Sequence, residues 1–275
     1  MDVLTGVIVG IRALLDTRTM IFVAIGLGWT VKLGALRLLL DAINGVGQDG
    51  PPHIRFFRFF QTIMFIAWVR MFLVYYDTPL PFWGSSFSKI LIDESTYLTN
   101  QLSQDSAANI WANLDTLWLS FQAPSIWAWA VFVPYLGLLG VILFCKGAML
   151  FVLAGSYTSF AVGIVLGPLF IPSLIFKETS WLFHGWFRVT LEFAFLPVVA
   201  MAYQMVMETF IFGFLSTVPP TVGVAEYAVY LYQSIAVILT MAFGTLTVPS
   251  LATSYFSGRA QHHHLGGMML AIVAR

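Results

Sequence analysis

Two glutamates stand in apolar sequence where a carboxylate could do chemistry. Glu192 and Glu208 lie in the apolar run over residues 190–215, and Arg188 stands four residues before Glu192. A charge at the centre of a membrane helix costs roughly 2.5–3.5 kcal/mol, which suggests a proton relay or a substrate gate. The spacing of four also allows Arg188 and Glu192 to form an ion pair at the membrane edge. Both interpretations stay open.

The remaining reactive side chains do not form a catalytic set. Glu192 and Glu208 stand about 160° apart around a helix, so they do not make a carboxylate dyad. His184 has no second ligand at metal-site spacing, and we expect it to pack against neighbouring tryptophans. The adjacent residues His262–His264 would point in different directions. No catalytic motif or nucleotide-binding glycine loop is present. We predict no catalytic, metal or cofactor residues, and a protein that is not an enzyme.

Residues 147–176 form an apolar stretch that glycines and prolines interrupt. Gly167 is followed by Pro168, and Pro172 comes one helical turn later. Proline removes a backbone donor and breaks a helix. Gly163 and Gly167 have the spacing that lets membrane helices pack closely, within one chain in the simplest case. We expect a broken or re-entrant helix here.

A short basic and aromatic turn, residues 177–188, follows this stretch. It contains Trp181, Gly185, Trp186 and Arg188, and a new apolar helix begins after it. A single-span anchor has no need of such a turn. The sequence therefore predicts a structural hinge between two membrane helices.

The composition decides the class of protein that carries these residues. Hydrophobic residues make up 59% of the 275 residues and charged residues only 9%, with a mean hydropathy of +0.85. A soluble domain carries roughly 25% charged residues. The fold class that we predict is an all-α polytopic membrane protein, in contact with membrane lipids.

Helical spans of about 20 apolar residues divide the chain. We expect five, over residues 20–40, 56–76, 126–145, 190–215 and 228–251. Residues 1–18 form either a separate surface or bundle-packed helix or an extension of the first span. The regions that we predict are 1–76 with the first helix and two spans, 77–126 outside the membrane core, 127–251 with the remaining helices, and a tail at 252–275.

Region 77–126 is the one long polar segment, and its apolar residues recur at helical spacing. Trp111, Leu114 and Trp118 share one face of a predicted amphipathic helix. Tryptophans are favoured as anchors in protein interfaces. We expect this face to be an interface with other subunits. The alternatives are burial against lipid or against the chain's own helix at 87–102.

Charge predicts the orientation, because basic residues favour the cytoplasmic side. Region 77–126 holds five carboxylates and one lysine, so we place it in the periplasm. The N-terminus is then periplasmic, the C-terminus cytoplasmic, and Lys146 cytoplasmic after the third span. A re-entrant element over residues 147–176 keeps Lys177 and Arg188 cytoplasmic, and we prefer it to a sixth full span.

The broken element also carries a resemblance to a known family. The run LGPLFIPSLIF at 166–176, the turn WLFHGWFR at 181–188 and a following helix with Leu-Pro are similar to the TrbL-type family. Its members are polytopic inner-membrane subunits of type IV secretion and conjugation machines, equivalent to the sixth VirB component. Residues 248–259 are similar to the family's C-terminal pattern, although only Ser257 to Arg259 correspond to its glycine-rich end.

The resemblance implies a function that the residues alone do not. It implies a channel or assembly-platform subunit of the bacterial inner membrane, forming a homo-oligomeric hub, possibly a ring, under the pilus or stalk. The implied partners are the minor pilin and pilin, other inner-membrane and ATPase components, and transient DNA or protein substrate. A small secondary transporter or permease is the alternative, and an intramembrane lipid-acting enzyme using His184, Glu192 and Glu208 is a further one.

Overall fold

The computed structural model describes residues 2–46, 52–94, 97, 107–121, 123–215 and 224–257. Within these ranges the chain is helical and contains no strand. Lipid offers no hydrogen-bond partners to a peptide backbone, so an apolar chain satisfies its own backbone groups by forming helices. The predicted all-α class is confirmed.

The helices are mostly much longer than those of a soluble domain. Their bounds are α1 Asp2–Val46, α2 Pro52–Val74, α4 Ala107–Ser120, α5 Trp129–Phe170, the 3₁₀ helix η1 Ile171–Ile175, α6 Ser180–Leu215 and α7 Val224–Ser257. Residues 87–94 form one further short helical stretch.

Five helices of the described chain are long and apolar enough to cross a membrane, as expected. They are Thr19–Asn44, Phe56–Val74, Trp129–Ile175, Ser180–Ile211 and Tyr227–Tyr255. The first 18 residues do not form a helix of their own. From Asp2 onward they continue into the first span as part of α1.

The third span differs from the expectation in one respect. We expected a span at 126–145 and a separate re-entrant element at 147–176, but α5 runs without interruption from Trp129 to Phe170. Its 42 residues extend over roughly 63 Å, about twice the hydrocarbon thickness of a bilayer. The helix does break, but the break lies at the C-terminal end of α5, where η1 begins.

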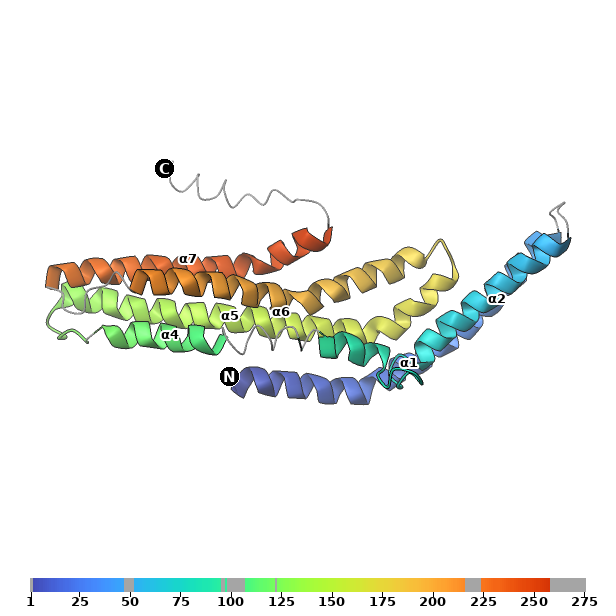
Figure 1. Ribbon diagram of the computed structural model, residues 1–275, viewed down its shortest axis with the longest axis horizontal. Coiled ribbons are helices and arrows are strands. Elements are labelled where there is room, and N and C mark those ends of the chain that lie inside the picture. The colour runs from blue at the N-terminus through green and yellow to red at the C-terminus, as the bar shows by residue number, and fades with distance from the viewer. Residues whose placement is uncertain are drawn as a thin grey trace, which may run out of the picture.

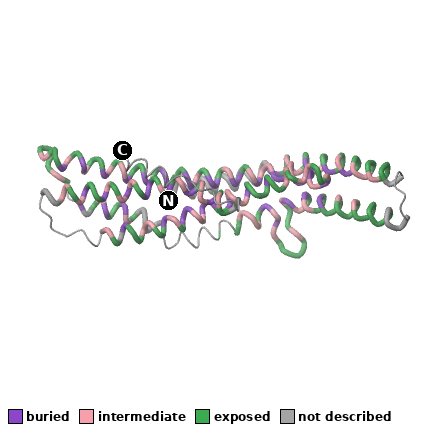
Figure 2. The backbone as a smooth tube through the Cα atoms, turned by 90° about the horizontal axis from the view of Figure 1, so that it is seen from above, coloured by how far each residue is buried: buried purple, intermediate pink, exposed green. Residues whose placement is uncertain are grey.

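The helices form an elongated bundle with a projecting hairpin (Figures 1 and 2). α5 lies against α6, α7 and α1, and α4 packs beside α5 and α6 near the start of α5. The hairpin of α1 and α2 projects beyond the opposite end of the bundle. The break at η1 contacts α1 and α2, and the turn between η1 and α6 lies beside Arg37, Asp41 and Arg58 in the outer half of the hairpin.

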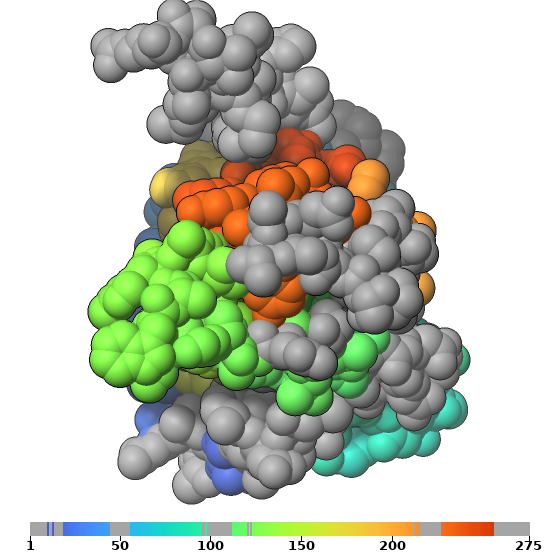
Figure 3. Space-filling model, turned by 90° about the vertical axis from the view of Figure 1, so that its left-hand side faces the viewer, coloured from blue at the N-terminus to red at the C-terminus, as the bar shows by residue number. Residues whose placement is uncertain are grey.

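Three clusters of buried apolar side chains run along the bundle. One joins α4, α5, α6 and α7 near the start of α5. A second joins α5, α6 and α7 in the middle. The third joins α2, α5, η1 and α6 at the break. Figure 3 shows the end of the bundle at which α5 and α7 begin, where side chains of these two helices lie against each other.

Lys146 corrects one step of the predicted topology. We placed it across the membrane from region 77–126, yet its Nζ lies 2.6 Å from Asp115 Oδ1 on α4, within that region. The two residues are therefore at the same level of the bundle. Lys146 resembled the cytoplasmic end of a span in the sequence. In the structure it is the ion-pair partner of Asp115, which lies 31 residues earlier in the chain.

Candidate functional site

The break after α5 arises from two prolines one helical turn apart. Pro168 and Pro172 have no N–H, so the carbonyls four residues earlier, those of Ile164 and Pro168, lose their helical donors. A buried carbonyl without a donor costs free energy. Other elements must therefore reach both positions.

Tyr76, just after α2, provides the donor for the first carbonyl. Its hydroxyl donates to the Ile164 carbonyl oxygen at 2.7 Å, and its side chain is 1% exposed. The broken helix is thus held by the end of the second span.

Two glycines let neighbouring helices reach the break. A Cβ on Gly167 would collide with the Tyr76 hydroxyl and would lie 2.6 Å from a ring carbon of Trp186. A Cβ on Gly26 of α1 would collide with the Pro168 carbonyl oxygen, which is the second freed acceptor. These contacts require glycine because no larger residue permits the approach.

Trp186 joins the hinge to α5. Its indole Nε1 donates to the Gly163 carbonyl at 2.7 Å, and its ring stacks with Phe170 at 6.2 Å between centroids. A Cβ on Gly163 would lie 2.7 Å from Thr190 Oγ1 of α6. Gly163 and Gly167 therefore pack helices closely inside this chain, which is the simplest of the expected cases.

Side-chain hydroxyls close the turn between η1 and α6. Ser173 Oγ donates to the Phe170 carbonyl at 2.6 Å. Thr179 Oγ1 lies 2.7 Å from the Ser173 carbonyl and 3.3 Å from that of Phe176. Carbonyls at the end of a helix have no helical donor, so these hydroxyls stabilise the point at which the chain reverses.

The two glutamates of α6 have different partners and lie apart from each other. Arg188 Nε is 3.4 Å from Glu192 Oε1, so the expected i, i+4 pair is present. Glu208 is sixteen positions further along α6, and its Oε1 accepts from Asn113 Nδ2 of α4 at 3.1 Å. The two glutamates do not meet, which agrees with the helical geometry.

The other hinge residues lie on the outside of the turn. The Trp181 side chain is 67% exposed, and Gly185 has open space at its Cβ position. Both line an apolar groove of about 570 Å³ between α5 and α6. The His184 ring contacts Phe183 edge-on at 5.6 Å, so the aromatic neighbour in contact is a phenylalanine, not a tryptophan.

The expected interface face of α4 is partly covered by the chain itself. Leu114 is fully buried in the cluster with α5 and α7, and Trp118 lies half-buried with its ring 4.1 Å from that of Tyr135. The side chain of Trp111 lies outside the described part of the chain. Intrachain packing therefore accounts for Leu114 and for one side of Trp118.

No metal-binding group of three or more His, Cys, Asp or Glu occurs among the described residues. His262–His264 lie beyond them. Cys145 is buried in the bundle. The described residues around the break thus offer packing and hydrogen bonds as their chemistry.

Sequence reasoning missed Tyr76 and Gly26 as parts of this site. Pro168 and Pro172 do carry a usable signal, because each proline identifies the carbonyl that it frees. The identity of the donor is not encoded locally, since Tyr76 lies 88 positions from Ile164. Only the tertiary structure, in which the segment after α2 reaches α5, reveals it.

A comparison with protein families matches most of the chain. The model of the TrbL/VirB6 plasmid conjugal transfer protein family matches residues 37–250, which include α2, α4, the break and the hinge. No curated protein matches the chain. A match of this extent, over a helical bundle with five candidate spans, assigns the chain to the TrbL/VirB6 plasmid conjugal transfer protein family.

Proposed function

We propose that this protein is the channel or assembly-platform subunit of its machine, with no enzymatic role of its own. Family membership makes it a component of a conjugal transfer or type IV secretion machine. The proposal places it in the bacterial inner membrane as a homo-oligomeric hub beneath the pilus or stalk. Its partners there are the pilins, other inner-membrane components and the ATPases, and its cargo is DNA or protein.

The family match over residues 37–250 carries this proposal. The chain itself buries some spans much less than others, and this difference supports the proposal of a homo-oligomer. Only 22% of the most apolar window of Thr19–Asn44 and 11% of that of Phe56–Val74 are buried, against 33–39% for the other three spans. Large side chains such as Trp29 and Trp68 are half exposed. A hairpin covered so little by its own chain has room for other copies as well as lipid.

The proposed orientation follows from which segments share an end of the bundle. Asn44 near the end of α1, Arg58 near the start of α2 and the turn with Lys177 lie at one end, and α4 with the starts of α5 and α7 lies toward the other. A single crossing by α5 keeps Lys177 and Arg188 on the side of Arg58. The positive-inside rule then places that end in the cytoplasm without a re-entrant hairpin.

A deletion strain tests the function. Removing the coding sequence from a donor cell should abolish substrate transfer, and the intact chain supplied in trans should restore it.

Crosslinking tests the homo-oligomer. Cysteines replacing Phe57 or Trp68 in a Cys145→Ala background should form crosslinked dimers in native membranes. Undiminished transfer would overturn the proposed role, and monomers alone from every hairpin position would overturn the hub.

α4 remains part of the proposed contact surface, through Trp111 and the exposed side of Trp118. Changing Trp118 to Ser should then reduce crosslinking or recruitment of a pilus component while protein level stays normal. Leu119, which is 77% exposed on the same helix, provides the matched control as Leu119→Ser. Equal effects of the two changes would count against a specific role for Trp118.

A further inference from the structure

A cavity of about 760 Å³ lies where the α1–α2 hairpin meets the turn between η1 and α6. Four side chains that carry or can take a positive charge line it: Arg37, Arg58, Lys177 and His184. Asp41 is the only carboxylate among its lining residues. Glu178 follows Lys177 in sequence but does not line the cavity. The excess of positive charge comes from α1, α2, the turn before α6 and α6 itself.

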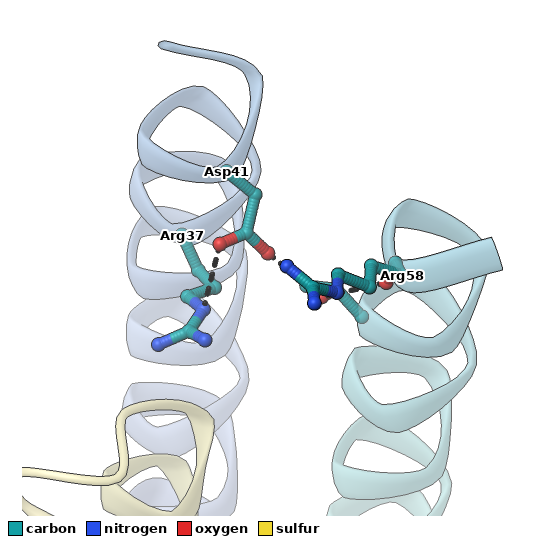
Figure 4. A network of polar contacts seen from close by, with 4 residues as sticks. Arg37, Asp41 and Arg58 are labelled. Atoms are coloured by element: carbon teal, nitrogen blue, oxygen red, sulfur yellow. Dashed lines mark hydrogen bonds and ion pairs between the residues drawn. The ribbon is translucent and has the colours of Figure 1, made fainter. Parts of the chain in front are cut away.

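The single carboxylate is already engaged by its neighbours. Asp41 Oδ1 is 3.4 Å from Arg37 Nε, and Asp41 Oδ2 accepts from Thr62 Oγ1 at 2.7 Å. Figure 4 shows Arg37 and Asp41 on α1 opposite Arg58 on α2. Within the described residues, Lys177 and His184 have no carboxylate partner. Unneutralised positive charge therefore remains on the α6 side of the cavity.

Besides the charged groups, the cavity is lined by apolar side chains and by the polar residues Asn44, Gln61, Thr62 and Ser180. Phe59, Phe65, Ile66, Leu174 and Ile175 line it beside the basic groups. The Arg37 guanidinium also lies 5.8 Å from the centre of the Phe176 ring, which holds that side chain against the turn. Next to the cavity, α2 presents Phe56, Phe57 and Phe60 with 49–71% of each exposed. Such a rim suits contact with lipid chains more than contact with water.

We propose that this cavity binds the phosphate headgroup of an anionic phospholipid. Basic pockets between membrane helices recognise such headgroups, and guanidinium groups form strong charge-assisted bonds with phosphate oxygens. The basic side of the cavity holds the phosphate, and the aromatic side lies along the first part of an acyl chain. The bound lipid links the α1–α2 hairpin to the α5–α6 turn. This site is independent of the proposed hub role.

Lipid retention by the purified full-length protein tests the site. The protein in mild detergent is titrated with phosphatidylglycerol, cardiolipin or phosphatidylcholine, and native mass spectrometry counts the bound lipids. The two anionic lipids should bind and phosphatidylcholine should not. Changing Arg58 and Lys177 together to Gln should weaken binding about thirtyfold, which corresponds to about 1 kcal/mol for each charge removed.

The chain offers a matched control in Lys32 and Arg70. Both are exposed, lie on α1 and α2, and do not line the cavity. Changing both to Gln removes the same charge and should leave binding intact. His184→Lys adds a full charge at an exposed position and should tighten binding about fivefold, so the test does not depend on a loss that misfolding could mimic.

Three outcomes would overturn the proposal. Equal weakening by the cavity pair and by the control pair would show only a general effect of net charge. Equal retention of phosphatidylcholine would remove the anionic preference. Tighter binding of inorganic phosphate, or of a short single-stranded oligonucleotide, would show that the cavity binds free phosphate or the phosphate of a nucleic acid instead of a lipid headgroup.

Discussion

Tyr76 is the residue on which the helix break depends, because its hydroxyl is the donor to the carbonyl that Pro168 leaves free. In Tyr76→Phe that carbonyl would be buried without a partner, at a cost of about 1–3 kcal/mol. We expect a lower unfolding midpoint for the purified protein in detergent. Tyr232→Phe, at a position 60% exposed on α7, is the control and should be neutral. Equal midpoints for the two variants would contradict the assignment.

Arg188 and Glu192 form a pair whose partners differ in exposure. The Arg188 side chain is half exposed and that of Glu192 is 15% exposed, so removing the arginine leaves a mostly covered carboxylate. We expect Arg188→Ala to lower both stability and substrate transfer, and Glu192→Gln to restore part of the loss in that background. A double-mutant cycle should give a coupling of roughly 0.3–1 kcal/mol. Strict additivity would mean that the contact contributes nothing.

The glycines of α5 were visible in the sequence, whereas their partners were not. The spacing of Gly163 and Gly167 predicts close helix packing, and the prolines predict the break. The glycine at position 26 carries no such local signal, because its importance comes from the Pro168 carbonyl on another helix. Residue types therefore indicated where the site lies, and tertiary packing determined how it is completed.

At the scale of elements, α5 shows how one charge can mislead a division into spans. Lys146 followed by Gly147 resembles the end of a helix, but glycine is only weakly unfavourable in a helix interior. The charge is accommodated by Asp115 of α4, a contact between distant parts of the chain that no local pattern contains. The number of spans was predictable from hydropathy, and the continuity of α5 was not.

The contact between α5 and α6 gives a prediction with a control inside the same helix. Gly163→Ala places a Cβ 2.7 Å from Thr190 Oγ1 and 3.1 Å from Thr190 Cγ2, so the helices must separate or Thr190 must change its rotamer. We expect destabilisation of about 1–3 kcal/mol, typical of overpacking. Thermal unfolding in detergent provides the measurement.

Gly155→Ala is the matched control for this change. Its Cβ would enter open space on the same helix, and alanine favours a helix by about 1 kcal/mol over glycine. The control variant should therefore be as stable as the original protein or slightly more so. If Gly163→Ala behaved like Gly155→Ala, the close approach of α5 and α6 would not be a feature of the folded protein.

At the scale of the whole molecule, the two ends of the bundle should lie on opposite sides of the membrane. Single cysteines placed in a Cys145→Ala background report this, because each variant then carries one thiol only. The native thiol is buried, so a labelling reagent reads the introduced position. Asn44 at the tip of the hairpin and Ser180 at the start of α6 share one end, and Leu119 on α4 lies toward the other. An impermeant maleimide applied from the periplasm should label position 119, and positions 44 and 180 only after the membrane is opened. Labelling of 119 and 180 from the same side would show that α5 does not cross the bilayer once, and the positive-inside argument for the end with Arg58, Lys177 and Arg188 would fail with it.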